Sequence, residues 1–139
     1  MQPIGDIADE LELVARETGR ALERANIPLR LPQDLAGVLV QIFHDLRSGQ
    51  TAGGKAIEPL TSAMSTAEAV SVGFAACVQA HYFGGGEPRA EHIAQHLVGT
   101  ALKDEPEDVR RLRAYLEHEV RGRRGQAWKD LYAARALLA

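Results

Sequence analysis

The chain of 139 residues is 45% hydrophobic and 25% charged, which describes one globular domain large enough to bury a core. A net charge of -3 and a pI near 5.9 provide no broad basic surface, so we expect neither nucleic acid nor a membrane as a partner. The single cysteine, Cys77, excludes an internal disulfide and favours a reducing compartment. The N-terminus is acidic and no apolar run approaches ~20 residues, so the sequence predicts a cytoplasmic protein without signal peptide or membrane span.

Apolar residues recur at helical spacing through almost the whole chain, which predicts an all-α fold. The first predicted helix covers residues 6–25 and ends at Asn26-Ile27-Pro28. The second covers residues 32–47, with a proline in its first turn and Ser48-Gly49 after its end. Residues 48–64 follow as the one long irregular segment, for which we expect a glycine-rich loop or a short hairpin.

Four more helices are predicted in the second half of the chain. The third, at residues 65–82, is apolar on nearly every side, which is typical of a helix in the centre of a bundle, and three glycines close it. The remaining helices are expected at about residues 93–102, at 109–120 after the break at Asp104-Glu105-Pro106, and from about Gln126 onward. We therefore predict a compact bundle of about six helices that forms a single domain over residues 1–139.

Gly49, Gly54 and Lys55 have the Gly-x4-Gly-Lys spacing of a phosphate-binding loop. Such a loop follows a buried strand and starts a helix at its lysine, whereas this segment follows a predicted helix. Ala56 lacks the hydroxyl group that would coordinate magnesium, and Pro59 opposes a helix at this point. We interpret the segment as a turn, and we expect Lys55→Ala to leave any nucleotide affinity nearly unchanged.

Ser65 and Glu68 have the spacing of a capping box directly before an apolar run. The Ser65 side chain would accept from the Glu68 amide, and the Glu68 side chain would accept from the Ser65 amide, which contributes about 1 kcal/mol. The pair has two interpretations. It either caps the helix and does nothing more, or it fixes a helix start whose free amides face an anion.

Two pairs of potential metal ligands lie four residues apart: Cys77 with His81, and His92 with His96. Across a helical hairpin they could form a zinc centre with nitrogen and sulfur ligands. The spacing is not a standard zinc pattern, so we expect no metal site, with Cys77 in the core and the histidines near the surface. No Ser-His-Asp or Cys-His grouping can be assembled either, and the chain alone is predicted to have no catalytic residues.

Arg121, Arg123 and Arg124 form a local basic cluster before Trp128. The charged segment 103–124 that contains them is interpreted mainly as a solvated helix face. The three arginines are nevertheless the candidate contact for an acidic partner surface or a neighbouring subunit, because arginine forks bind carboxylates in pairs.

Four stretches occur in a fixed order along the chain: LPQDLAGVLVQIFHDLRSG, MSTAEAVSV, EHIAQHLVGTALKDEPED and WKDLY. In this order and spacing they resemble the C-terminal helical lid, with a helical extension, of MoxR-type AAA+ ATPases. Members of that family are bacterial chaperone-like motors that often work with a partner carrying a von Willebrand factor A domain.

The resemblance implies that ATP and Mg are cofactors of a full-length protein and not of this chain alone. It also implies an N-terminal AAA+ core that binds the nucleotide, and neighbouring subunits in an oligomeric ring. The family's lid often contributes a phosphate-sensing arginine near the start of the helix at Ser65, where this sequence has Thr66-Ala67-Glu68. Arg47 or Lys55 could substitute for it only by a route that the sequence does not show. The residues implied to lie near the nucleotide are Ser65, Thr66 and Glu68.

Two classes of function stay open at this point. The first is a lid that transmits nucleotide state between subunits, and the second is a free-standing helical interaction domain with no nucleotide role. A phosphate loop and an arginine finger encoded in frame directly upstream would discriminate between them.

Overall fold

The computed structural model describes residues 6–51, 54, 56–57, 65–83, 85–97 and 106–134. Within these ranges the fold is all-α, as predicted, and the described residues contain no strand longer than an isolated bridge. The elements in chain order are α1 (Asp6–Arg24), α2 (Gln33–Ser48), α3 (Thr66–Tyr82), α4 (Ala90–His96), α5 (Pro106–Tyr115), the π-helical segment η2 (Leu116–Val120) and α6 (Gln126–Ala133).

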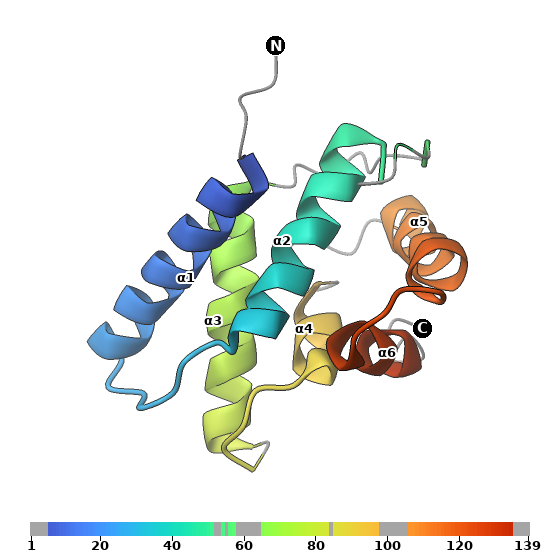
Figure 1. Ribbon diagram of the computed structural model, residues 1–139. Coiled ribbons are helices and arrows are strands. Elements are labelled where there is room, and N and C mark those ends of the chain that lie inside the picture. Colours follow the sequence, from blue (N-terminus) through green and yellow to red (C-terminus); the bar gives the residue numbers. More distant parts are fainter. Residues whose placement is uncertain are drawn as a thin grey trace.

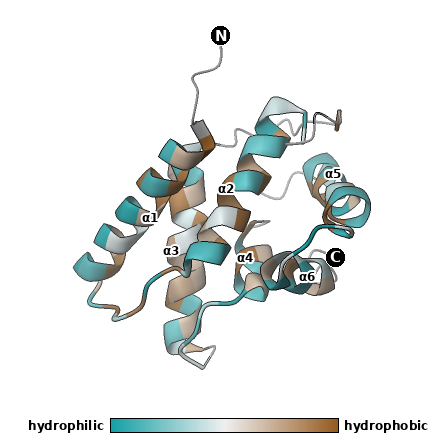
Figure 2. Cartoon of the chain, in the orientation of Figure 1, coloured by the Kyte–Doolittle hydropathy of each residue, from teal (hydrophilic) through white to brown (hydrophobic). Residues whose placement is uncertain are grey.

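The helices form two groups that share α2 and α4 (Figure 1). On one side α1 packs against both α2 and α3, and α3 also packs against α4. On the other side α6 lies against α2, α4 and η2, the last of which follows directly from α5. Hydrophobic faces of the helices turn toward one another, and the outer sides of α1 and α5 are hydrophilic (Figure 2). No helix in the described ranges has both the length and the apolar composition that crossing a bilayer requires.

The main core joins both groups of helices. Phe43 and Leu39 of α2 are fully buried in it, and each such side chain contributes about 1.5–3 kcal/mol by leaving water. A smaller cluster of Leu22, Ile27 and Cys77 fills the space between α1, the following turn and α3. The other large, fully buried members of the main core are Ile42, Leu46, Ile93, Leu97, Leu112, Leu116 and Leu131.

The glycine-rich segment begins as the short hairpin that the sequence allowed. Gly49 ends α2 in the left-handed conformation, with φ of 77°, and its N–H donates to the Asp45 carbonyl at 2.9 Å. Gln50 then pairs with Ala56 in an antiparallel bridge, and α3 begins only at Thr66. A helix before the segment and a bridge within it agree with a turn rather than a phosphate loop. Lys55 and residues 58–64 lie outside the described residues.

Two features differ from the sequence predictions, and part of the predicted fourth helix lies outside the described residues. The described part of the fourth helix ends at His96, and residues 98–102, which were predicted to continue it, lie outside the described residues. The fifth helix changes to π-helical geometry after Tyr115, which was not predicted. The third helix is not enclosed on all sides as predicted: residues such as Phe74 and Val78 are only half-buried, so α3 keeps one face toward solvent.

Candidate functional site

A buried carboxylate, Glu10, lies where α1, the end of α2 and the start of α3 meet. Its side chain is 8% exposed and accepts hydrogen bonds from both terminal nitrogens of Arg47, Nη2 at 2.9 Å and Nη1 at 3.3 Å. Thr66 Oγ1 donates to the same carboxylate at 2.9 Å. We call Glu10, Arg47 and Thr66 the Glu10 junction. It places the Arg47 guanidinium beside the start of α3.

The start of α3 has the predicted capping box. Ser65 Oγ accepts from the Glu68 amide at 3.2 Å, and Glu68 Oε1 accepts from the Ser65 amide at 3.2 Å. Two carboxylates, those of Glu68 and Glu10, therefore adjoin this helix terminus, where the helix dipole stabilises negative charge. The same two charges repel a further anion, so the α3 amides alone are a poor phosphate site. Among the described residues, Arg47 places a cation at this end of the helix.

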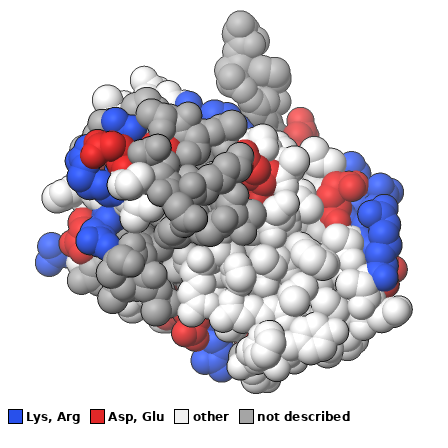
Figure 3. Space-filling view, turned by 180° about the vertical axis from the view of Figure 1, so that it is seen from behind, with Lys and Arg blue, Asp and Glu red and all other residues white. Residues whose placement is uncertain are grey.

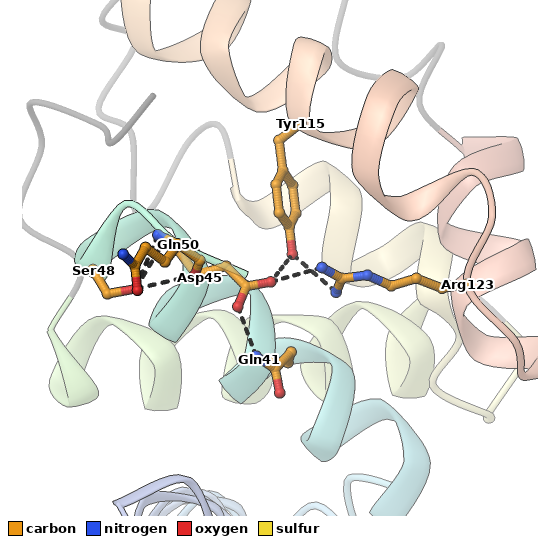
Figure 4. Close-up of polar contacts among 6 residues, drawn as sticks. All are labelled: Gln41, Asp45, Ser48, Gln50, Tyr115 and Arg123. Atoms are coloured by element: carbon orange, nitrogen blue, oxygen red, sulfur yellow. Dashed lines mark hydrogen bonds and ion pairs between the residues drawn. The ribbon is translucent and has the colours of Figure 1, made fainter. Parts of the chain in front are cut away.

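A second buried carboxylate, Asp45, lies two residues before Arg47 on α2 and faces the other group of helices (Figure 4). Asp45 is fully buried and accepts from Gln41 Nε2 at 2.6 Å, Tyr115 Oη at 2.7 Å and Arg123 Nη2 at 2.8 Å. Arg123 Nη1 also donates to Tyr115 Oη at 3.1 Å. We call Gln41, Asp45, Tyr115 and Arg123 the Asp45 cluster. It joins α2 to the end of α5 and to the turn before α6.

Tyr115 and Arg123 of the Asp45 cluster keep their protons through ordinary changes of pH. Burial raises the pKa of Tyr115 well above its usual range, so its hydroxyl keeps the proton that it donates. Burial alone would lower the pKa of Arg123, but its contacts with Tyr115 and Asp45 outweigh burial and raise it. The guanidinium also lies 4.4 Å from the centre of the Trp128 ring, a cation–π contact. Arg123 is therefore a fixed structural cation.

The structure separates the three arginines that the sequence grouped as a surface cluster. Arg121 and Arg124 are exposed, and Arg124 lines an open groove of about 430 Å³ together with Trp128. The Arg123 side chain is only 20% exposed and forms its ion pair inside the domain, because the turn after η2 directs it toward Asp45. Arg123 lines the same groove with the exposed part of its side chain. Partner contact by Arg121, Arg123 and Arg124 stays a prediction.

The potential zinc ligands do not come together. The described residues contain no group of three histidine, cysteine or acidic side chains that could hold a metal ion. Cys77 is in the core, where burial raises its thiol pKa to about 11, and metal binding needs the thiolate. The expectation of surface histidines is wrong for His92, which is buried, with its Nδ1 accepting from the Arg89 amide at 3.0 Å. His96 Nε2 lies 2.6 Å from Gln79 Oε1.

Glu10, Asp45 and Tyr115 were missed by the sequence reasoning. Asp45 had a detectable signal, because it stands on the apolar stripe of its helix, three residues after Ile42 and directly before Leu46. A charged residue at such a position predicts a buried partner. Glu10 and Tyr115 had no comparable signal.

Comparison with known proteins gives one family and one curated relative. A family model described as the YehL-like AAA+ ATPase C-terminal domain matches residues 8–139. "Uncharacterized protein YehL" of Escherichia coli (strain K12) is 38% identical over 135 residues, which make up 96% of this chain and 36% of that protein. The chain thus spans about a third of the length of this relative. No solved structure matches the chain.

Proposed function

This chain belongs to the family of YehL-like AAA+ ATPase C-terminal domains, and we propose that it acts as the helical lid of an ATP-hydrolysing motor. The observation that carries the proposal is the family match, which extends over nearly the whole chain. The lid transmits nucleotide state to neighbouring subunits and has no catalytic machinery of its own. The match favours this function over a free-standing interaction domain.

A lid that transmits nucleotide state must move as one body, and the two buried carboxylates support such movement. The Glu10 junction connects α2 to α1 and α3, and the Asp45 cluster connects α2 to α5 and α6. Buried ion pairs of this kind have few alternative arrangements, so both groups of helices are held in fixed positions relative to α2.

Arg47 is the residue of this lid that meets the nucleotide phosphate in our proposal, and Ser65, Thr66 and Glu68 fix the helix start beside it. A helix terminus contributes only about 0.3–1 kcal/mol to an exposed anion, whereas a hydrogen bond to a charged group contributes about 1.5–3 kcal/mol. Arg47 keeps 40% of its side chain exposed, so its guanidinium is accessible from outside the domain.

The full assembly is proposed from the resemblance alone. It is a cytoplasmic, chaperone-like motor of the MoxR type, with ATP and Mg bound by an N-terminal AAA+ core and with several subunits in a ring. Exposed Arg121 and Arg124 contact the neighbouring subunit, and a von Willebrand factor A domain protein is the external partner.

The test uses the full-length protein and the same protein without this domain. We expect the ATPase rate to depend on the domain, and Arg47→Ala to lower it about 10- to 100-fold, the equivalent of one charged hydrogen bond. Arg24→Ala, at the exposed far end of α1, is the matched control and should leave the rate unchanged. An ATPase rate that is the same with and without the domain would exclude the lid function.

The isolated chain should not bind ATP measurably in a calorimetric titration with magnesium. Even millimolar affinity requires about 4 kcal/mol, which the start of α3 cannot supply. Micromolar binding by the isolated chain would overturn the proposal, because the nucleotide site would then lie within these residues.

A further inference from the structure

One face of α3 is uncharged and remains open to solvent. Between Glu68 and His81 the helix contains no charged residue, and half-buried apolar side chains recur every fourth position on it. Viewed from behind, the molecule shows a broad uncharged area on the side where α3 lies, with the charges gathered at its edge (Figure 3). We call this the outer α3 face, and its apolar residues are Val70, Phe74, Val78, Tyr82 and Phe83.

The outer α3 face ends in two exposed aromatic rings. Tyr82 is 61% exposed and Phe83 is 85% exposed, and they are the large hydrophobic side chains that the described part of the chain leaves in solvent. Their backbone is fixed, because the Phe83 amide donates to the Gln79 carbonyl at 2.8 Å and the Gly86 amide donates to the Ala80 carbonyl at 2.7 Å. An exposed apolar surface whose backbone is already ordered loses little conformational entropy when it binds a partner. Such surfaces are typical docking sites.

We propose that the outer α3 face docks the AAA+ core domain of the same polypeptide, an inference that rests on the proposed function. The E. coli relative extends beyond the match by about 240 residues, and the family is a C-terminal domain. A domain of that size has a radius of gyration of about 18 Å. The 17 residues of α3 extend about 25 Å, so a core of this size reaches along the whole face.

The first turns of α1 lie at one end of the outer α3 face, because Thr66 at the start of α3 donates to Glu10 in the second turn of α1. A core that precedes α1, as the description of the family as a C-terminal domain implies, would join the domain at this end. An uncharged apolar surface also suits a permanent partner, because permanent interfaces are more hydrophobic than transient ones. A core in the same chain is such a partner, whereas an exchanging client is not.

Site-specific photo-crosslinking in the full-length protein tests the proposal. Benzoylphenylalanine replaces Phe83 in one variant and the exposed Ser71 of α3 in a second, so that the result does not depend on one position. Arg113, exposed on the charged outer side of α5, is the control position. We expect both α3 probes to crosslink to AAA+ core peptides within one polypeptide, with a yield about tenfold or more above the control, because a packed interface excludes competing water.

The mass of the product identifies the occupant. A crosslinked band at the monomer mass, with core peptides, supports the proposal. A band at the dimer mass would assign the face to a second copy, and a yield no higher than at Arg113 would leave it without a partner; either result overturns the proposal. The lid function and the docking surface can fail separately. If the ATPase rate depends on this domain but the α3 probes do not crosslink, only the docking surface is refuted.

Discussion

Removing Arg123 should cost the domain more stability than removing any exposed arginine. Arg123→Ala leaves the fully buried Asp45 carboxylate with only Gln41 and Tyr115 as hydrogen-bond donors. Breaking a buried ion pair in this way typically costs about 3–5 kcal/mol, because one charge stays buried without its partner. For a domain of 139 residues, at about 3–5 °C per kcal/mol, the melting temperature should fall by about 10–20 °C.

Urea unfolding followed by circular dichroism at 222 nm measures the loss, with an unchanged slope as the sign that only stability has changed. Arg121→Ala, two residues earlier on the exposed side of the same turn, is the matched control and should stay within about 0.5 kcal/mol of the original chain. The double variant Asp45→Leu, Arg123→Met removes both charges and should be more stable than Arg123→Ala alone. A loss below about 1 kcal/mol for Arg123→Ala would refute the reasoning, since it would mean that Asp45 does not depend on this cation.

Three further predictions concern stability. Thr18→Val should stabilise the domain by about 1 kcal/mol in urea unfolding, because Thr18 Oγ1 is buried and has no hydrogen-bond partner among the described residues. Gly37→Ala should also stabilise the domain by about 0.5–1 kcal/mol, since a Cβ there meets open space. At Gly73 a Cβ would lie 3.1 Å from a leucine methyl group, so Gly73→Ala should stabilise the domain less or destabilise it. Burial lowers the pKa of both His92 and His96, so the unfolded chain takes up protons first and stability should fall as the pH drops below about 6.5; His92→Gln should flatten this dependence in melts between pH 7.5 and 5.5.

The helices could be predicted from sequence because their signals are local. The starts of α2 and α3 follow from a proline and a capping box, and the end of α2 follows from Gly49; the structure agrees with the predicted bounds to within one residue at each of these points. The π-helical turn of η2 could not be predicted in this way, because it depends on how Tyr115 and Leu116 are both buried against other helices.

The candidate site was less predictable because its partners are far apart in sequence. Arg47 and Glu10 are separated by 37 residues, and Arg123 and Asp45 by 78. The sequence around Gly122 contains three arginines of equal character, and only the packing of α6 against η2 decides which one turns inward. Local reasoning therefore located the basic segment correctly but could not separate its structural cation from its exposed ones.

The last turn of α2 is where the two halves of the proposed mechanism meet. Asp45 and Arg47 are two residues apart, about 200° around the helix, so one points to α5 and α6 while the other points to α1 and α3. In the proposed function, a phosphate that binds the exposed part of Arg47, which stays paired with Glu10, acts directly on this turn. Because Asp45 belongs to the same turn and is bound to Arg123, a shift there is passed to the segment that carries Arg121 and Arg124. The distance between nucleotide and subunit surface is thus bridged by one helical turn with an ion pair on each side.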